Sequence, residues 1–575
     1  MLIEARTVEP GKRIETDVCI IGCGPAGIAL VRELAAPALQ VTVLESGGRD
    51  FDQNAQTLCD GKIISPDGYP SDLLRTARRR QLGGTANLWN DELDEGEGDE
   101  LVRLVPLDAI DFEKRAWVPD SGWPFQKSAL EPFYEAALKL GGAGSLSEPD
   151  LETSKTNRAE LLGPHARLGT MMSQFGPRTT FIRDYPDALA RDENVRVYLN
   201  ATLLELVSSD HQVRYARVAV APEREFEVAA KFFVLAAGGI ENARLLLLCD
   251  QKQPNGLGNE YDVVGRFFMD HPSFRLGVLT PADRNLFRSA GLYDHHMMNG
   301  ARVMGKLTFR EKIMRQEEML NICATLTPRA RSYESDAVET VKRVIASKSP
   351  VAVVTLLRKE CRHLIAGWDE VLTKCYEKLT NKRLRYFENK GGWSRLENNE
   401  RRFRRFELRC LSEQAPNSQN RVTLGNAVDR LGQRKAELHW RWSAIDLRSI
   451  RRAQEILREE FERHQLGEFA GQHELDGGEA PRFVSPHHHL GTTRMHSNPR
   501  QGVVDPNCQV YGVANLYVAG SSVFPTGGFA NPTLTIIALA LRLSYHLKEL
   551  MKPPLSSLSG AVVPPATPDG RAPAK

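Results

Sequence analysis

Gly22-Cys-Gly24-Pro-Ala-Gly27 is the stretch that decides the fold, because it separates a short apolar run from a segment rich in small residues. The apolar run, Asp17–Ile21, is typical of a buried parallel strand. Residues 25–35 predict a helix, and Val41–Glu45 predicts a second buried strand. This order of strand, helix and strand has the length of a nucleotide-binding unit.

The three glycines have different tasks in such a unit. Gly22 lets the chain turn, Gly24 lets backbone amides approach a pyrophosphate, and Gly27 lets the helix pack closely on the strand. Glu45 lies eighteen residues after Gly27, where a carboxylate accepts hydrogen bonds from ribose hydroxyls and repels the extra phosphate of NADP. A glycine-rich turn without a ligand is the alternative, but strand, helix and acidic residue together favour a Rossmann-like dinucleotide site.

Strands that resemble pieces of one sheet are spread over the whole chain. Residues 194–206, 231–239 and 515–520 each indicate such a strand. The second domain must therefore be inserted between these strands. The predicted fold class is α/β, a Rossmann-like dinucleotide-binding domain with an inserted α+β substrate domain. We assign residues 14–99, 190–270 and 484–550 to the first domain, residues 100–189 and 271–483 to the second, and residues 551–575 to a disordered tail.

The inserted domain has strand and helix signals of its own. Residues 413–424 and 437–442 predict two paired strands, and residues 446–464 predict an amphipathic helix. Residues near 335–406 predict a helical arm. The last part of the arm, 376–406, holds ten Lys or Arg against four Glu. Such a charge run is either a solvated helical face or a docking surface for an anionic lipid, an acidic partner or a neighbouring subunit.

The composition of the 575 residues limits the class of protein. Hydrophobic residues make up 41% and charged residues 26%, as in soluble globular proteins. Lys and Arg number 75 against 73 Asp and Glu, so no global charge draws this protein toward nucleic acid or a membrane. No apolar run is long enough for a transmembrane segment and Met1–Glu15 does not resemble a secretion signal, so we expect a cytoplasmic protein. The nine cysteines include no CxxC, which argues against zinc ribbons and covalent haem.

The C-terminal part holds the residues suited to chemistry. His487-His-His489 precedes Leu-Gly-Thr-Thr, and Asn531-Pro-Thr533 follows after a glycine-rich stretch. Oxidation of an alcohol by a flavin requires a base for the hydroxyl proton, and a histidine with a pKa of about 6.5 suits this task. An asparagine amide can hold the developing alkoxide oxygen. Asn531 also predicts a helix N-cap with Pro532 as the first helical residue, before a helix over 533–547.

Each of these residues has a simpler interpretation. The histidine run could bind a metal or form a turn without a role, and Asn531 could be only a helix cap. No Cys or carboxylate lies at ligand spacing, so we predict no metal site. If the histidine run is a strand, His488 points to one side and its two neighbours point to the other.

From residue 17 to about residue 550 the order of motifs resembles the glucose–methanol–choline (GMC) FAD-dependent oxidoreductases, and within them the pyranose-oxidase-like and glycoside-oxidising branch. The resemblance rests on the N-terminal glycine stretch, Gly83-Gly84-Thr85, Val264–Pro272 and the C-terminal block. In the family the base histidine lies four residues before the threonine of a Gly-Thr pair. This spacing maps the base onto His488, and the second catalytic residue maps onto Asn531.

The resemblance also implies contacts with FAD. The family loop over the flavin ring corresponds to residues 83–89, here called the flavin loop, and the implied FAD contacts are Gly84, Thr85, Asn87, Leu88, Gly520, Asn531 and Thr533. Pyranose oxidases carry a histidine, covalently bonded to the flavin, where this chain has Leu88. We therefore expect non-covalent FAD. His271 is expected to be structural.

The function implied by the resemblance is oxidation of a hydroxyl group on a small molecule, namely a sugar, glycoside or polyol-like metabolite. Aliphatic, aromatic and choline-like alcohols stay open as substrates, and either oxygen or an external acceptor could take the electrons. A flavin-binding electron carrier and a flavin hydroxylase using NAD(P)H are the alternative classes. Neither of them needs His488 and Asn531 together.

Overall fold

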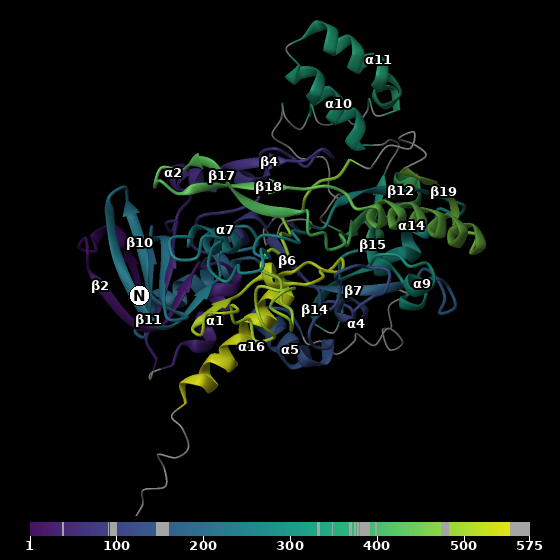
Figure 1. The fold of residues 1–575 in the computed structure, drawn as a ribbon. Helices are drawn as coiled ribbons and strands as arrows, with labels where there is room; N and C mark the ends of the chain where they lie inside the picture. The colour runs from purple at the N-terminus through teal and green to yellow at the C-terminus, as the bar shows by residue number, and fades with distance from the viewer. Residues whose placement is uncertain are drawn as a thin grey trace, which may run out of the picture.

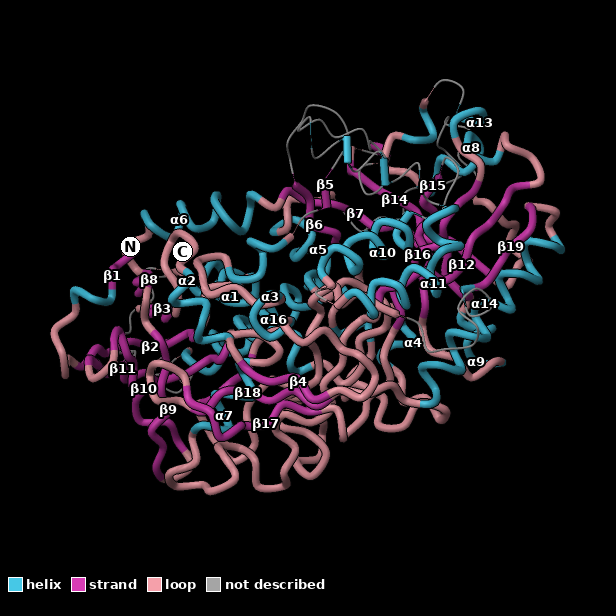
Figure 2. The backbone as a smooth tube through the Cα atoms, turned by 90° about the horizontal axis from the view of Figure 1, so that it is seen from above, coloured by secondary structure: helices cyan, strands magenta, loops and turns pink. Residues whose placement is uncertain are grey.

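The computed structural model describes residues 1–36, 39–89, 91–92, 100–144, 160–298, 300–329, 334–347, 349–366, 368, 371–372, 375–376, 379, 391–396, 399–472 and 482–552. Two large β-sheets lie toward opposite ends of the molecule, and helices α1 (Pro25–Leu34) and α16 (Thr533–Met551) lie between them (Figure 1, Figure 2). The predicted α/β class is confirmed.

The first sheet has eight strands within the described residues, and its centre is parallel. All five residues of its strand β3 are buried, as expected for a parallel strand covered on both faces. The strands predicted at 17–21, 41–45, 194–206, 231–239 and 515–520 all join this sheet. Its order is β1 (Leu2–Glu4), β8 (Val195–Leu199), β3 (Val41–Glu45), β2 (Arg13–Ile21), β11 (Arg224–Leu235), β10 (Gln212–Ala221) and β9 (Thr202–Ser209), with β20 (Leu516–Val518) paired to β11.

The second sheet has nine strands in the part of the chain that is described, and its neighbouring strands are antiparallel. Its order is β19 (Gly467–Gly471), β12 (Ser273–Pro281), β16 (Arg405–Ser412), β15 (Ile322–Arg329), β14 (Ala301–Phe309), β7 (Leu168–Pro177), β6 (Glu100–Leu104) and β5 (Asp91–Glu92), with β13 (His296–Met298) paired to β14. We assigned the residues of β5 to the first domain, but β5 pairs with β6 and so belongs to the second sheet. The domain boundaries stay a prediction.

The two strands predicted at 413–424 and 437–442 pair with each other, but outside the second sheet. β17 (Arg421–Val428) is antiparallel to β18 (Arg434–His439), and β18 is parallel to β4 (Gly61–Ile64). These strands form a small sheet of three. The pairing of β18 with β4 joins residues that lie far apart in the sequence, and local strand patterns cannot predict such a pairing.

The longer helices cover the sheets and one another. α16 packs against α1 and α5 (Glu131–Leu140), and α14 (Ala444–Arg463), predicted at 446–464, packs against β19. In the first turn of α14, Asp446 accepts a hydrogen bond from the backbone N–H of the N-cap Ser443 at 2.7 Å. The shorter helices are α2 (Gln53–Gln56), α3 (Leu73–Thr76), α4 (Ala109–Phe112), α6 (Tyr185–Arg191), α7 (Glu241–Leu248), α8 (Leu286–Ser289), α9 (Glu311–Gln316) and α13 (Asn399–Arg402).

The predicted arm contains α10 (Glu334–Ala346) and α11 (Pro350–Ala366), which pack against each other and stand above the second sheet in Figure 1. Of its basic segment, residues 377–378, 380–390 and 397–398 lie outside the described part. The predicted tail also lies outside it from residue 553 on, whereas Met551 is still the last residue of α16.

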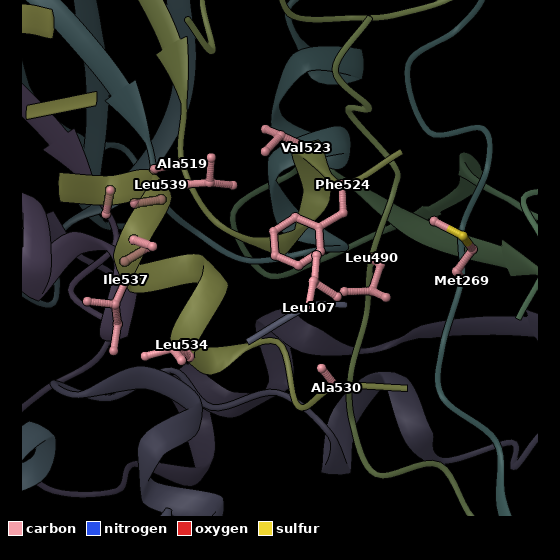
Figure 3. Close-up of a cluster of buried hydrophobic side chains, with 14 of the residues drawn as sticks. Leu107, Met269, Leu490, Ala519, Val523, Phe524, Ala530, Leu534, Ile537 and Leu539 are labelled. Atoms are coloured by element: carbon pink, nitrogen blue, oxygen red, sulfur yellow. The ribbon is translucent and has the colours of Figure 1, made fainter. Parts of the chain in front are cut away.

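A continuous hydrophobic core holds the C-terminal block in place. Figure 3 shows Leu490, Phe524, Ala530 and Leu534 in this core. Ala530 directly precedes Asn531, and Leu490 lies two residues after His488. Their burial therefore fixes the backbone that carries the predicted catalytic side chains.

Candidate active site

A cavity of about 590 Å³ runs from the start of α1 to the C-terminal block, and both large sheets contribute to its walls. Most of the predicted site residues line it, although they come from both ends of the chain. They are Gly22, Gly24, Glu45, Gly84, Thr85, Leu88, His488, Gly520, Asn531 and Thr533. Arg103 of β6, Arg409 and Leu411 of β16, and Val484 line it where the second sheet borders the cavity.

In the glycine turn between β2 and α1, two glycines allow close packing and the third leaves the cavity open to a ligand. A Cβ on Gly22 would lie 2.7 Å from the carbonyl oxygen of Ala236, and one on Gly27 would lie 2.1 Å from that of Gly22. These two glycines are required for packing. A Cβ on Gly24 would have Gly84 Cα, at 3.7 Å, as its nearest neighbour. Gly24 therefore leaves the cavity open at the N-terminus of α1, where a phosphate charge is favoured.

Glu45, at the end of β3, is buried at the cavity wall. Its Oε2 accepts the Cys23 backbone N–H and its Oε1 accepts the Gly47 backbone N–H, both at 2.9 Å. Burial raises the pKa of this carboxyl, and the two hydrogen bonds oppose the increase. Glu45 thus braces the glycine turn, a contact that the predicted role at the ribose did not include.

The flavin loop forms a short helical turn over Gly84–Leu88. Thr85 and Leu88 face the cavity, but Asn87 is not among its lining residues. The Asn87 side-chain NH₂ instead donates to the carbonyl oxygens of Leu82 at 3.0 Å and Gly84 at 2.9 Å. Asn87 therefore stabilises the flavin loop through backbone contacts and does not line the cavity. Gly27 likewise supports the glycine turn without lining the cavity.

A buried ion-pair cluster next to the flavin loop was missed in the sequence. Glu241, the first residue of α7, pairs with Arg78 at 3.0 Å, Arg80 at 2.8 Å and Arg244 at 2.8 Å. Burial would raise the pKa of Glu241, but the three arginines bring it well below its usual range. The cluster ties the residues before the flavin loop to the segment after β11. The run Arg78-Arg79-Arg80 was its signal in the sequence.

The three consecutive histidines lie in an irregular loop, so the prediction of a strand there is wrong. His487 has a left-handed φ of 69° and is exposed. His489 is buried against Phe268, with ring centroids 5.6 Å apart. The left-handed turn at His487 breaks strand alternation, and all three histidines line the cavity.

The His488 ring contacts two polar side chains. Its Nε2 lies 3.4 Å from Asn531 Nδ2, which brings the two predicted catalytic residues together. Its Nδ1 lies 3.0 Å from Nδ1 of His271, a buried side chain. The His271 ring therefore reaches the candidate base, a contact that the expected structural role did not include. The signal available in the sequence was Asp270-His271-Pro272, at the end of the motif Val264–Pro272.

Asp270 holds the two histidine-bearing segments together. Its Oδ1 accepts the backbone N–H groups of His271 at 2.7 Å and His488 at 3.1 Å. Its Oδ2 accepts the Tyr69 hydroxyl at 2.7 Å and the Ser485 hydroxyl. One buried carboxylate thus positions the backbone on both sides of the histidine contact.

Asn531 lies before α16 rather than capping it. α16 begins at Thr533 with Pro532 as its N-cap, so the prediction of Asn531 as N-cap is wrong by one residue. The Asn531 side chain turns toward His488 and away from the helix amides. Its Oδ1 is buried, with no hydrogen-bond partner among the described residues. Asn531 is therefore available to a ligand in the cavity.

These contacts imply which nitrogens carry protons. An amide Nδ2 is a donor, so Asn531 leaves His488 Nε2 as an acceptor. His488 then carries its proton on Nδ1 and donates it to His271 Nδ1. The lone pair at Nε2 is the one beside Asn531, where a hydroxyl group could be bound.

Burial keeps this group of histidines neutral. It lowers the pKa of His271 to about 4 and that of His489 to about 4. Burial and the neighbouring His271 and His487 hold the pKa of His488 well below its usual range. A neutral His488 can accept a proton at Nε2 near neutral pH.

Comparison with known proteins places this site in a family. Residues 416–540, which include the histidine loop and Asn531, match the family model of the GMC oxidoreductases. The chain carries a GMC oxidoreductase domain. The resemblance drawn from the sequence motifs is thereby confirmed.

The proteins to which this chain is similar differ in how much of it they match. The C-glycoside 3-oxidase of Arthrobacter globiformis is 36% identical over 130 residues, which cover 22% of this chain and only 23% of that protein. The 2-methyl-1,2-propanediol dehydrogenase of Mycolicibacterium austroafricanum is 21% identical over an alignment that covers 92% of this chain and 94% of that protein. The solved formate oxidase of Aspergillus oryzae covers 95% of this chain and 99% of its own, with a TM-score of 0.51 and 15% identity, which shows a shared fold.

Proposed function

We propose that this chain binds FAD in the cavity and oxidises an alcohol group of a small molecule to a carbonyl. The lining residues fit such a cofactor. Gly24 opens the turn at the N-terminus of α1, which suits a pyrophosphate, and Gly84, Thr85 and Leu88 line the wall next to it. When bound, FAD would supply the acceptor for the hydride that leaves the alcohol carbon. With Leu88 on the flavin loop, we propose that the FAD is held without a covalent bond.

The observation that carries this proposal is the pairing of His488 Nε2 with Asn531 Nδ2, 3.4 Å apart, on the cavity wall. A substrate hydroxyl bound between them would donate its hydrogen to Nε2 and accept a hydrogen bond from Nδ2. As the hydride leaves the carbon, the O–H bond breaks, its proton moves to Nε2, and the carbon–oxygen double bond forms. The Asn531 amide would hold the oxygen while negative charge develops on it.

His271 would act as a positioning residue for His488. Its Nδ1 accepts the His488 Nδ1 proton, which keeps the Nε2 lone pair directed at the substrate. When Nε2 takes up the substrate proton, His488 becomes a cation, and its Nδ1–H still has an acceptor. Because burial keeps the pKa of His271 low, His271 stays neutral and can continue to accept.

For the substrate, we propose a sugar, glycoside or related polyol. The similarity to a C-glycoside 3-oxidase, which is the stronger in identity, supports this class. A branched aliphatic diol is the second candidate, because the similarity to a 2-methyl-1,2-propanediol dehydrogenase extends over 92% of the chain. The electron acceptor is either oxygen or an external compound, and the experiment below distinguishes the two.

The test is an anaerobic panel of reductants added to the flavin-loaded protein. It contains a monosaccharide, a C-glycoside, 2-methyl-1,2-propanediol and NADPH, and the yellow flavin absorbance is followed over time. Bleaching by one of the alcohols and not by NADPH supports the proposal, and colour that returns in air identifies oxygen as the acceptor. Bleaching by NADPH alone would indicate a hydroxylase. A flavin that only dithionite reduces would indicate an electron carrier.

A further inference from the structure

Helix α11 of the arm carries an apolar stripe on its exposed side. The stripe consists of Val351, Val354, Leu357, Cys361 and Ile365, and it continues beyond the helix at Trp368 and Leu372. Successive members are three or four residues apart, which places the five members within α11 on one helical face. Trp368 and Leu372 keep the same spacing. The exposed fraction is 76% for Val351, 75% for Ile365 and 61% for Trp368. We call these seven residues the arm stripe.

The opposite side of α11 faces α10. Glu360 is buried there, and Arg343 of α10 donates to its carboxylate at 3.5 Å. Glu360 is the only acidic residue in the sequence of α11. The neighbours of the arm stripe, Arg358 and Lys359, are both basic and both exposed. The exposed side of α11 therefore combines apolar surface with positive charge.

The charge of the arm differs from that of the remaining chain. Residues 334–406 hold seventeen Lys or Arg and ten Asp or Glu. The whole chain has a net charge of only +2, so the part outside the arm is net acidic. Positive charge is thus concentrated on the segment that exposes the arm stripe.

We infer that the arm docks this protein on an anionic lipid surface, with the arm stripe at the boundary between head groups and acyl chains. Such a surface supplies an apolar bed and negative charge together. Lys and Arg beside the stripe can bury their apolar stems while their charged ends reach the head groups. A second copy of the arm would instead bring like charges together. In the described part of the chain, no helix has the length and apolar character needed to cross a bilayer.

Vesicle flotation of the full-length protein tests this inference. Vesicles of phosphatidylcholine alone are compared with vesicles that contain phosphatidylglycerol as the anionic lipid. The wild type should float with the anionic vesicles and much less with the neutral ones, and high salt should release it. Ile365→Glu with Trp368→Glu should abolish flotation. Arg358→Glu with Lys359→Glu should weaken binding roughly tenfold or more.

Val428→Glu is the matched control, because Val428 of β17 is also exposed (55%) but lies outside the arm. It should float like the wild type. A second measurement uses brominated lipid, which should quench a tryptophan signal that is missing in Trp368→Phe. No flotation of the wild type with anionic vesicles would overturn the inference. So would unchanged flotation of both arm variants, or a dimer in light scattering that these variants dissociate. None of these readouts depends on the enzymatic activity.

Discussion

Nδ1 of His271 lies 3.0 Å from Nδ1 of His488, so one of these two nitrogens carries a proton and the other accepts it. With Asn531 at the other nitrogen of His488, the acceptor is His271. The His271→Leu variant should still bind FAD, but the alcohol should reduce the flavin more slowly, because the tautomer of His488 is no longer fixed. Losses of this kind lie between about 10-fold and 10⁴-fold.

The control for His271 is the conservative variant His271→Asn, whose Oδ1 can accept the same hydrogen bond. We expect it to recover a large part of the rate measured by anaerobic stopped-flow. Its acid limb in a pH–rate profile should lie closer to that of the wild type than the limb of His271→Leu. Equal rates and profiles for both variants would contradict a positioning role.

Two glycines of the same turn should respond in opposite ways to substitution. Gly24→Val should fold normally, because a Cβ there meets its nearest neighbour at 3.7 Å, but its side chain should obstruct the cavity and leave protein poor in FAD. Gly27→Ala places a Cβ 2.1 Å from a backbone oxygen, so the free energy of unfolding should fall by about 1–3 kcal/mol. Flavin content per chain and Tm measure the two effects. Full flavin occupancy in Gly24→Val would place the nucleotide elsewhere.

Attachment of the cofactor can be read from acid precipitation. Leu88 lines the cavity, and its aliphatic side chain has no atom that can form a covalent bond to a flavin. Acid should therefore release all of the FAD into the supernatant. A washed pellet that stays yellow would mean that another side chain forms a covalent bond.

The pH dependence of flavin reduction should reflect the low pKa of His488. A histidine of ordinary pKa, about 6.5, would be half protonated at that pH, and the rate would have fallen by half. Because burial holds the pKa of His488 well below this value, the neutral base persists to lower pH. The reduction rate should stay level through pH 6.5 and fall only in more acidic buffer. A decline already centred at or above that pH would argue against His488 as the base.

Local patterns predicted the parts of the structure that are encoded locally. A strand, three spaced glycines and a helix are contiguous in the chain, and so is the spacing that singled out His488. The pairing of β4 with β18, the cluster around Glu241 and the ring contact of His271 join segments far apart in the sequence. No local pattern reports such contacts. Asn531 was misplaced as a cap because its amide contacts His488 instead of the helix backbone.

Removal of the hydroxyl proton is the role that we propose for His488. Its most direct test is anaerobic stopped-flow reduction of the flavin in His488→Ala, with the alcohol that reduces the wild type fastest. The variant should keep its FAD, and the reduction rate should fall by about 10²–10⁴-fold. His489→Ala is the matched control and should lose much less, because the His489 ring packs against Phe268. A near-normal reduction rate in His488→Ala would contradict the role of His488 as the base.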